Sequence, residues 1–210
     1  CWILLAAPAQ TQFSLARTGV PALIVGTCYP GVNLPSVDFD HEAVGWHAAG
    51  SILGHGHTKI GLILPAGPMP GDSACRLGFL RYVHQRANSV ALTEISAPPN
   101  PVQYRARLDR LLGVSDRPTV LFTMRQPLTL TLIIHVLASG LRIPRDVSIV
   151  SRDTHPLFEA AFPELTRYSG STTTLATRIV RIASILLAGR HVAARPAFVT
   201  PTFVAGSTLA

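Results

Sequence analysis

The chain has 210 residues, of which 48% are hydrophobic and 14% charged, and its formal net charge is +7. This composition is typical of a globular protein of one or two domains and excludes a disordered chain. No apolar run reaches the length of a membrane span. The basic residues are dispersed, without a basic run or a helix-turn-helix pattern, which argues against direct DNA binding by these residues.

Strands and helices alternate through most of the chain, which favours parallel sheets joined by crossover helices. In the first 58 residues the expected elements are strands at 2–6, 21–25 and 35–39 and helices at 10–17 and 40–53. Asp40 is the expected N-cap of the second helix, whose apolar residues Val44, Ala48 and Ile52 recur every four positions.

The same alternation continues to the C-terminus. The expected elements are strands at 59–64, 90–95, 119–123 and 147–150, helices from about 72, from 101, at 128–139 and at 171–188, and an extended segment at 197–204. Asn100-Pro101 combines a cap residue with a proline at the first helical position. The helix that begins at Ser171 has the clearest apolar period, and Gly189 ends it.

The cysteines and the first residues indicate the compartment. Cys1, Cys28 and Cys75 are odd in number and lack CxxC spacing, which favours free thiols in a reducing, cytoplasmic compartment over a disulfide. The opening CWILL lacks the basic region of a signal peptide. The chain does not begin with Met, which suggests that it is a truncated one.

One segment is more specific than the others. Residues 140–150, GLRIPRDVSIV, connect the end of a helix to a buried strand, and they resemble the effector-binding core of the LacI/GalR transcription regulators. Further blocks follow in the order of that family: VDFDHEA at 37–43, GHGHTKIG at 54–61, GF at 78–79, PTVLF at 118–122, VSIVSRDTHP at 147–156 and FVAGST at 203–208. Each block is weakly specific alone, but the ordered set is hard to obtain by chance.

The resemblance implies a periplasmic-binding-protein-like α/β fold of type I, with two parallel-sheet subdomains and a ligand cleft between them. By analogy, the N-terminal subdomain comprises residues 1–38 and 171–199, and the C-terminal subdomain comprises residues 40–168 and 201–210. The N-terminal subdomain is expected to be incomplete, because the family begins it with further β-α units. The family also carries a DNA-binding headpiece that is absent from this sequence, so operator DNA would be contacted only through such a headpiece.

Asp153 is the first candidate ligand residue. It follows the strand at 147–150, and ligands of open α/β sheets bind beyond the carboxyl ends of strands. A carboxylate at this position can accept hydrogen bonds from sugar hydroxyls. In the family, the first Asp of a GFDD loop does this, and Asp153 matches it. The alternative is a turn aspartate that caps the following segment.

Several positions depart from the family pattern. After the strand at 119–123 the family carries Asn-Asp, where this chain has Arg125-Gln126. The arginine expected three residues before the helix glycine is Cys75, with Arg76 one position away. Arg125, together with Arg76 and Arg152, suggests an anionic ligand such as a sugar phosphate or a sugar acid. Alternatively, Arg125 pairs with a local acid or points to solvent.

These features predict the effector-binding and dimerisation core of a bacterial LacI/GalR-like transcription regulator that senses a sugar or a related small molecule. The expected ligand-binding residues are Asp153, Arg125 and Arg76. The expected partners are a small-molecule effector, which is a sugar, sugar phosphate or sugar acid, and a second copy in a homodimer. No membrane association, cofactor or metal ion is expected.

A periplasmic solute-binding protein of the same architecture is the alternative. An enzyme is not expected, because no acid–base or nucleophile constellation is present and no GxSxG surrounds Ser148 or Ser151.

Overall fold

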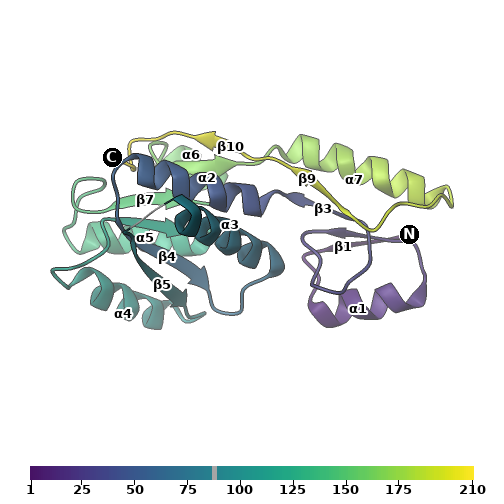
Figure 1. Cartoon of the computed structure of the whole chain (residues 1–210), viewed down its shortest axis with the longest axis horizontal. Helices are drawn as coiled ribbons and strands as arrows, with labels where there is room; N and C mark the ends of the chain where they lie inside the picture. The colour runs from purple at the N-terminus through teal and green to yellow at the C-terminus, as the bar shows by residue number, and fades with distance from the viewer. Residues whose placement is uncertain (87–88) are drawn as a thin grey trace. The chain divides into compact units, whose positions relative to one another are not determined.

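The computed structural model describes residues 1–86 and 89–210, and it contains two separate sheets built mainly from parallel strands (Figure 1). Contacts between residues divide the chain into two compact units. The first unit comprises Cys1–Asp40, Met69–Gly71 and Gly170–Pro201, and the second comprises His41–Pro68, Asp72–Ser169 and Thr202–Ala210. The mixed α/β class with parallel sheets is the one that the sequence predicts. The assignment of residues 69–71 to the first unit was not expected from the sequence.

The first unit is a four-stranded parallel sheet with the strand order β1-β2-β3-β9. Its elements are β1 (Trp2–Leu5), α1 (Ala9–Thr18), β2 (Ala22–Val25), β3 (Ser36–Phe39), α7 (Thr172–Leu187) and β9 (Pro196–Val199). Its core joins Leu23 of β2 and Val37 of β3 to Leu186 of α7. Ser171 caps α7 by accepting a hydrogen bond from the backbone N–H of Thr174 at 3.1 Å. The first unit therefore depends on a helix from the C-terminal part of the chain.

The second unit is a six-stranded sheet with the order β10-β8-β7-β6-β4-β5, in which only β10 runs antiparallel to its neighbour. Its strands are β4 (Lys59–Pro65), β5 (Ala91–Ala97), β6 (Val120–Thr123), β7 (Ser148–Ser151), β8 (Thr166–Ser169) and β10 (Thr202–Val204). Its helices are α2 (His41–Gly54), α3 (Pro70–Arg86), α4 (Pro101–Leu112), α5 (Gln126–Ala138) and α6 (Pro156–Ala161).

Helices cover both faces of the second sheet, and the strand sequences explain why. Successive residues of a strand point to opposite faces. Phe122 and Val150 pack with α2 and α3 in one core, whereas Leu121 and Ile149 pack with α4 and α5 in another. Both faces must therefore be apolar, which accounts for the hydrophobic runs in β4 and β6. Figure 1 shows the two pairs of helices on either side of these strands.

Several element predictions are confirmed, and two elements were not predicted. Asn100 caps α4 by accepting a hydrogen bond from the backbone N–H of Val102 at 2.9 Å, as the sequence predicts. The expected extended segment at 197–204 is in fact two strands that belong to different sheets. Neither α6 nor β8 was predicted, because α6 is only six residues long and the TRYS sequence of β8 has no apolar alternation.

The last residues of the chain are integrated into the second sheet. The hydroxyl of Thr208 donates to the carbonyl of Ile149 at 2.6 Å and accepts from the backbone N–H of Thr166 at 2.9 Å. The backbone N–H of Ile149 in turn donates to the carbonyl of Thr208 at 2.8 Å. Thr208 and Leu209 are both buried. The tail thus connects β7 to β8 and forms part of the core.

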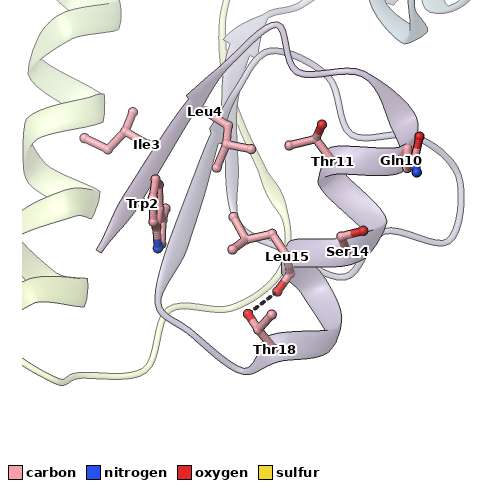
Figure 2. A pocket seen from close by; sticks show the side chains of 8 residues that line it. All are labelled: Trp2, Ile3, Leu4, Gln10, Thr11, Ser14, Leu15 and Thr18. Atoms are coloured by element: carbon pink, nitrogen blue, oxygen red, sulfur yellow. Dashed lines mark hydrogen bonds between the residues drawn. The ribbon is translucent and has the colours of Figure 1, made fainter.

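The strand β1 lies at an edge of the first sheet. Trp2 and Leu5 are exposed there. A hollow of about 660 Å³ lies between β1 and α1 and is lined by Trp2, Ile3, Leu4, Gln10, Thr11, Ser14, Leu15 and Thr18. Figure 2 shows Leu4 and Leu15 directed toward this shared space.

In the described part of the chain, no helix has the length and apolar character that a membrane span requires.

Candidate functional site

Four charged residues meet at the carboxyl ends of three adjacent strands in the second unit. Asp72 lies in the first turn of α3, which follows β4; Arg125 follows β6; and Arg152 and Asp153 follow β7. Because β4, β6 and β7 are neighbouring parallel strands, their carboxyl ends share one edge of the sheet. We call Asp72, Arg125, Arg152 and Asp153 the charged cluster.

Asp72 connects the two arginines of the charged cluster. Its Oδ2 accepts hydrogen bonds from Nη2 of Arg125 at 2.6 Å and from Nε of the same residue at 3.2 Å. Its Oδ1 accepts a hydrogen bond from Nη1 of Arg152 at 2.7 Å. The side chain of Asp72 is only 2% exposed. A carboxylate that is buried to this extent needs such charge-assisted hydrogen bonds to compensate for its loss of hydration.

Asp153 also accepts hydrogen bonds from both arginines, from the side chain of Arg152 and from the backbone of Arg125. Its Oδ1 accepts from Nε of Arg152 at 3.0 Å, and its Oδ2 accepts from Nη2 of Arg152 at 3.2 Å. Oδ2 also accepts from the backbone N–H of Arg125 at 2.9 Å. Asp153 therefore uses three of the roughly four acceptor positions of a carboxylate. Its side chain is 21% exposed, so one edge of it faces solvent.

The backbone of Arg125 is in an unusual conformation. Its φ is +68° and its ψ is 132°, and it occupies the N-cap position of α5. A positive φ in a residue other than glycine costs about 1–3 kcal/mol and persists only where the surroundings enforce it. The hydrogen bond from the Arg125 N–H to Asp153 is one such constraint. Backbone strain of this kind is characteristic of functional sites.

The loop that carries Asp153 is held by further hydrogen bonds. The hydroxyl of Ser151 donates to the backbone carbonyl of Asp153 at 2.8 Å and lies 3.1 Å from the hydroxyl of Thr129 on α5. The amide of Gln126 donates to the carbonyl of Thr154 at 2.8 Å. These contacts fix the direction of the Asp153 side chain before any ligand binds.

The charged cluster contains two positive and two negative groups, so its formal charges balance. Arg152 is almost completely buried. Burial alone would lower the pKa of the Arg152 guanidinium, but the charges and hydrogen bonds of Asp153 and the charge of Asp72 keep this pKa above its ordinary value. The Arg125 side chain is 38% exposed. Arg125 and Asp153 are therefore the members that solvent, or a ligand, can reach.

Arg125 and Asp153, two of the three expected ligand residues, lie together, and Arg76 lies elsewhere. Nε and Nη2 of Arg76 donate to Glu94 on β5 at 2.6 and 2.7 Å, and the pair is exposed. The guanidinium of Arg125 is paired with an acid, Asp72. Such a pairing is one of the alternatives that the sequence leaves open. The replacement of the family's arginine by Cys75 leaves a buried thiol there, and burial raises its pKa to about 12.

Sequence reasoning missed one member of the charged cluster, Asp72, which it took only as a helix start. Its partners Arg125 and Arg152 are 53 and 80 residues away in the sequence, so no local spacing could reveal the contacts. The available indication was that α3 directly follows a buried strand. The first turn of such a helix lies at the carboxyl edge of the sheet, beside the loops after the neighbouring strands.

The hollow between β1 and α1 in the first unit is a poorer candidate for binding a polar ligand. Its lining combines apolar side chains with hydroxyls and one amide, without a charged group. The hydroxyl of Thr18 is already used, since it donates to the carbonyl of Leu15 at 2.8 Å. Specific recognition of a sugar depends on several convergent polar groups, which the charged cluster provides.

Comparisons with known proteins agree on one architecture. Residues 49–209 match the family model described as periplasmic binding protein-like domain. The chain is 24% identical over 196 residues to the HTH-type transcriptional repressor CytR of Escherichia coli K12, covering 88% of this chain and 54% of the repressor. It is 26% identical over 157 residues to the HTH-type transcriptional regulator DegA of Bacillus subtilis, covering 72% of this chain and 45% of the regulator. The chain thus spans about half the length of the curated relatives it matches.

A solved structure shows the same fold. The LacI family transcriptional regulator from Enterococcus faecium, which was solved with bound ribose, superimposes with a TM-score of 0.82 at 18% identity. The match covers 99% of this chain and 79% of the regulator.

Proposed function

Because the chain belongs to the family of periplasmic binding protein-like domains, in the form found in LacI/GalR regulators, we propose that it is the effector-sensing core of a bacterial, cytoplasmic transcription regulator. The effector is a sugar or a related small molecule, and Asp153 and Arg125 contact it. The named relatives are transcription regulators, which favours this function over that of a periplasmic solute-binding protein.

The observation that carries the proposal is the placement of Asp153 and Arg125 at the carboxyl edge of the sheet. Asp153 retains acceptor capacity on a partly exposed carboxylate, and Arg125 has a partly exposed guanidinium. A sugar hydroxyl both donates and accepts, so it can bind to an adjacent acceptor and donor at once. The ribose complex of the Enterococcus faecium regulator supports a sugar as the class of effector to test first.

The sensing mechanism that we propose is a population shift. An effector that binds one conformation of the core more tightly than another moves the equilibrium toward the first. In the whole regulator, a DNA-binding headpiece outside this chain would respond to that shift, and two copies of the core would associate as a homodimer. The effector and operator affinities would then be coupled reciprocally.

The test is calorimetric titration of the chain with a panel of pentoses, hexoses and nucleosides, followed by operator binding of the whole regulator with and without any compound that binds. We expect at least one compound to bind the chain and to change operator affinity. A compound that binds but leaves operator affinity unchanged would count against a regulatory role. Absence of binding across the panel would count against sugar sensing.

A further inference from the structure

We propose that Asp72 determines the ligand class of the charged cluster: by neutralising Arg125 and Arg152 together, it makes the site select uncharged polyhydroxyl ligands over anionic ones. This inference rests on the proposed function, because it concerns the same site. It replaces the expectation from the sequence that three arginines would favour a sugar phosphate or a sugar acid.

The Asp72 carboxylate contacts both arginines of the charged cluster. It offers one oxygen to each guanidinium, Oδ2 to Arg125 and Oδ1 to Arg152. A phosphate or carboxylate group of a ligand would form the same kind of charge-assisted contact with these arginines. Asp72 thus already occupies the position that an anionic group would take, and its negative charge would repel a second anion nearby.

Asp72 is held firmly in place. Its side chain is 2% exposed and lies in the first turn of α3. Three and six residues later in the same helix, Cys75 and Gly78 pack against α2, so the start of α3 is fixed by a tight helix contact. An anionic ligand could displace Asp72 from Arg125 only by leaving a buried carboxylate with fewer partners, which is unfavourable.

The groups that remain available to a ligand belong to Arg125 and Asp153. Arg125 uses Nε and Nη2 on Asp72, and its guanidinium is partly exposed. Asp153 accepts three hydrogen bonds and is partly exposed. The accessible groups are therefore a donor and an acceptor in an electrically balanced setting. Vicinal hydroxyls match this pair without adding a charge, whereas a phosphate adds up to two negative charges.

Asp72→Asn tests the inference, because it keeps the side-chain shape and one oxygen acceptor but leaves the charged cluster with a net charge of +1. Calorimetry would compare ribose with ribose 5-phosphate, and glucose with glucose 6-phosphate, for the unchanged chain and the variant. We expect the unchanged chain to bind each phosphate no more tightly than its parent sugar. In Asp72→Asn, the preference should move toward the phosphate by about 10- to 100-fold.

Two further variants control for other effects. Asp116→Asn changes the charge equally at a residue that is 81% exposed and pairs with Lys59, so it should leave the preference unchanged. Asp72→Asn combined with Arg125→Gln restores the charge balance and should cancel the gain for the phosphate. A gain that is equal in Asp116→Asn, or that persists in the double variant, would overturn the inference. So would tighter binding of the phosphates by the unchanged chain.

Inorganic phosphate separates this inference from the proposed function. If the unchanged chain binds none of the sugars, the proposed sugar sensing fails, but the charge argument can still be decided by thermal melting. At equal ionic strength, phosphate should raise the melting temperature of Asp72→Asn relative to chloride, and it should not do so for the unchanged chain. If the variant does not fold in chloride, phosphate should restore its folding. Equal melting temperatures of Asp72→Asn in phosphate and in chloride would overturn the inference.

Discussion

Gly45 of α2 and Gly78 of α3 lie at a reciprocal close contact between these two helices. A Cβ atom on Gly45 would lie 1.9 Å from the carbonyl oxygen of Cys75, and one on Gly78 would lie 2.0 Å from the carbonyl oxygen of Glu42. Neither backbone can move away without separating the helices. Because α3 carries Asp72, this contact also places one member of the charged cluster.

Gly78→Ala should therefore destabilise the second unit. The methyl group forces α2 and α3 apart, and overpacking of this kind costs about 1–3 kcal/mol. Gly54→Ala is the control, since a Cβ there meets nothing within 4 Å and Gly54 ends α2, the other helix of this contact. Calorimetric melting should show a clear decrease for Gly78→Ala and little change for Gly54→Ala. Equal melting temperatures would show that the helices can separate without cost.

Asp153→Ala should weaken effector binding while the protein stays folded. The variant removes a partly exposed carboxylate that we expect to bind a ligand hydroxyl, and the loss of a charged hydrogen-bond partner reduces affinity by about 10- to 100-fold. Titration calorimetry with a compound that the unchanged chain binds measures the effect. Asp116→Ala, which removes an exposed aspartate outside the charged cluster, is the control. Unchanged affinity in Asp153→Ala would remove this residue from the site.

The turn before β7 should give an acid-dependent contribution to stability. Nε and the backbone N–H of Arg142 donate to Asp146 at 2.9 and 2.8 Å, and these bonds, the side-chain one foremost, lower the pKa of Asp146 from 3.8 to about 2. A carboxyl whose pKa is lower in the folded state stabilises the protein above its unfolded pKa. The contribution is therefore present above about pH 4 and is lost as the pH falls toward 2.

Melting temperatures of Asp146→Asn and the unchanged chain, measured between pH 7 and pH 2, test this sign. We expect the variant to melt at a lower temperature at neutral pH, with the difference closing between pH 4 and pH 2. Asp116→Asn serves again as the exposed control. A difference that stays constant down to pH 2 would mean that Asp146 acts through the shape of the turn rather than through its charge.

Self-association can be tested on α5, where Ile134 and Leu137 are 52% and 51% exposed and lie one turn apart. Exposed apolar residues that share a helix face are typical of protein interfaces. If this face contributes to the proposed homodimer, Ile134→Lys with Leu137→Lys should shift sedimentation toward the monomer at micromolar concentration. Val102→Lys, at a residue of α4 that is 74% exposed, is the control. If the chain without substitutions already sediments as a monomer, the proposed homodimer is contradicted.

The sequence predicts most of the second sheet because its signals are local. The hydrophobic runs of β4 and β6 and the cap at Asn100 each depend on residues within a few positions. By contrast, β8 is a strand because its neighbours β7 and β10 pair with it. Its own sequence, TRYS, contains the strand-favouring Thr166 and Tyr168 but is too short and too polar to stand out, so the pairing with its neighbours decides its conformation.

The charged cluster could be predicted only in part, for a related reason. Asp153 and Arg125 each follow a predicted strand, and parallel strands bring such residues to one edge. Which acid pairs with Arg125 depends on the exact start of α3, which is Pro70 rather than residue 72 or 73. Arg76 was chosen because of its single-position offset from the family pattern. The structure directs Arg76 to Glu94 because one helical position turns a side chain by about 100°.

The order of strands along the chain also constrains how the protein is made. The core of the first unit joins Leu23 and Val37 to Leu186, and the second unit incorporates Thr208 and Leu209 between β7 and β8. During synthesis from the N-terminus, β1, β2 and β3 emerge long before α7 is available to cover them. Neither unit can reach its complete core until Leu186 and Leu209 have left the ribosome, so the exposed apolar strands of a nascent product that lacks them are natural substrates for chaperones and proteases.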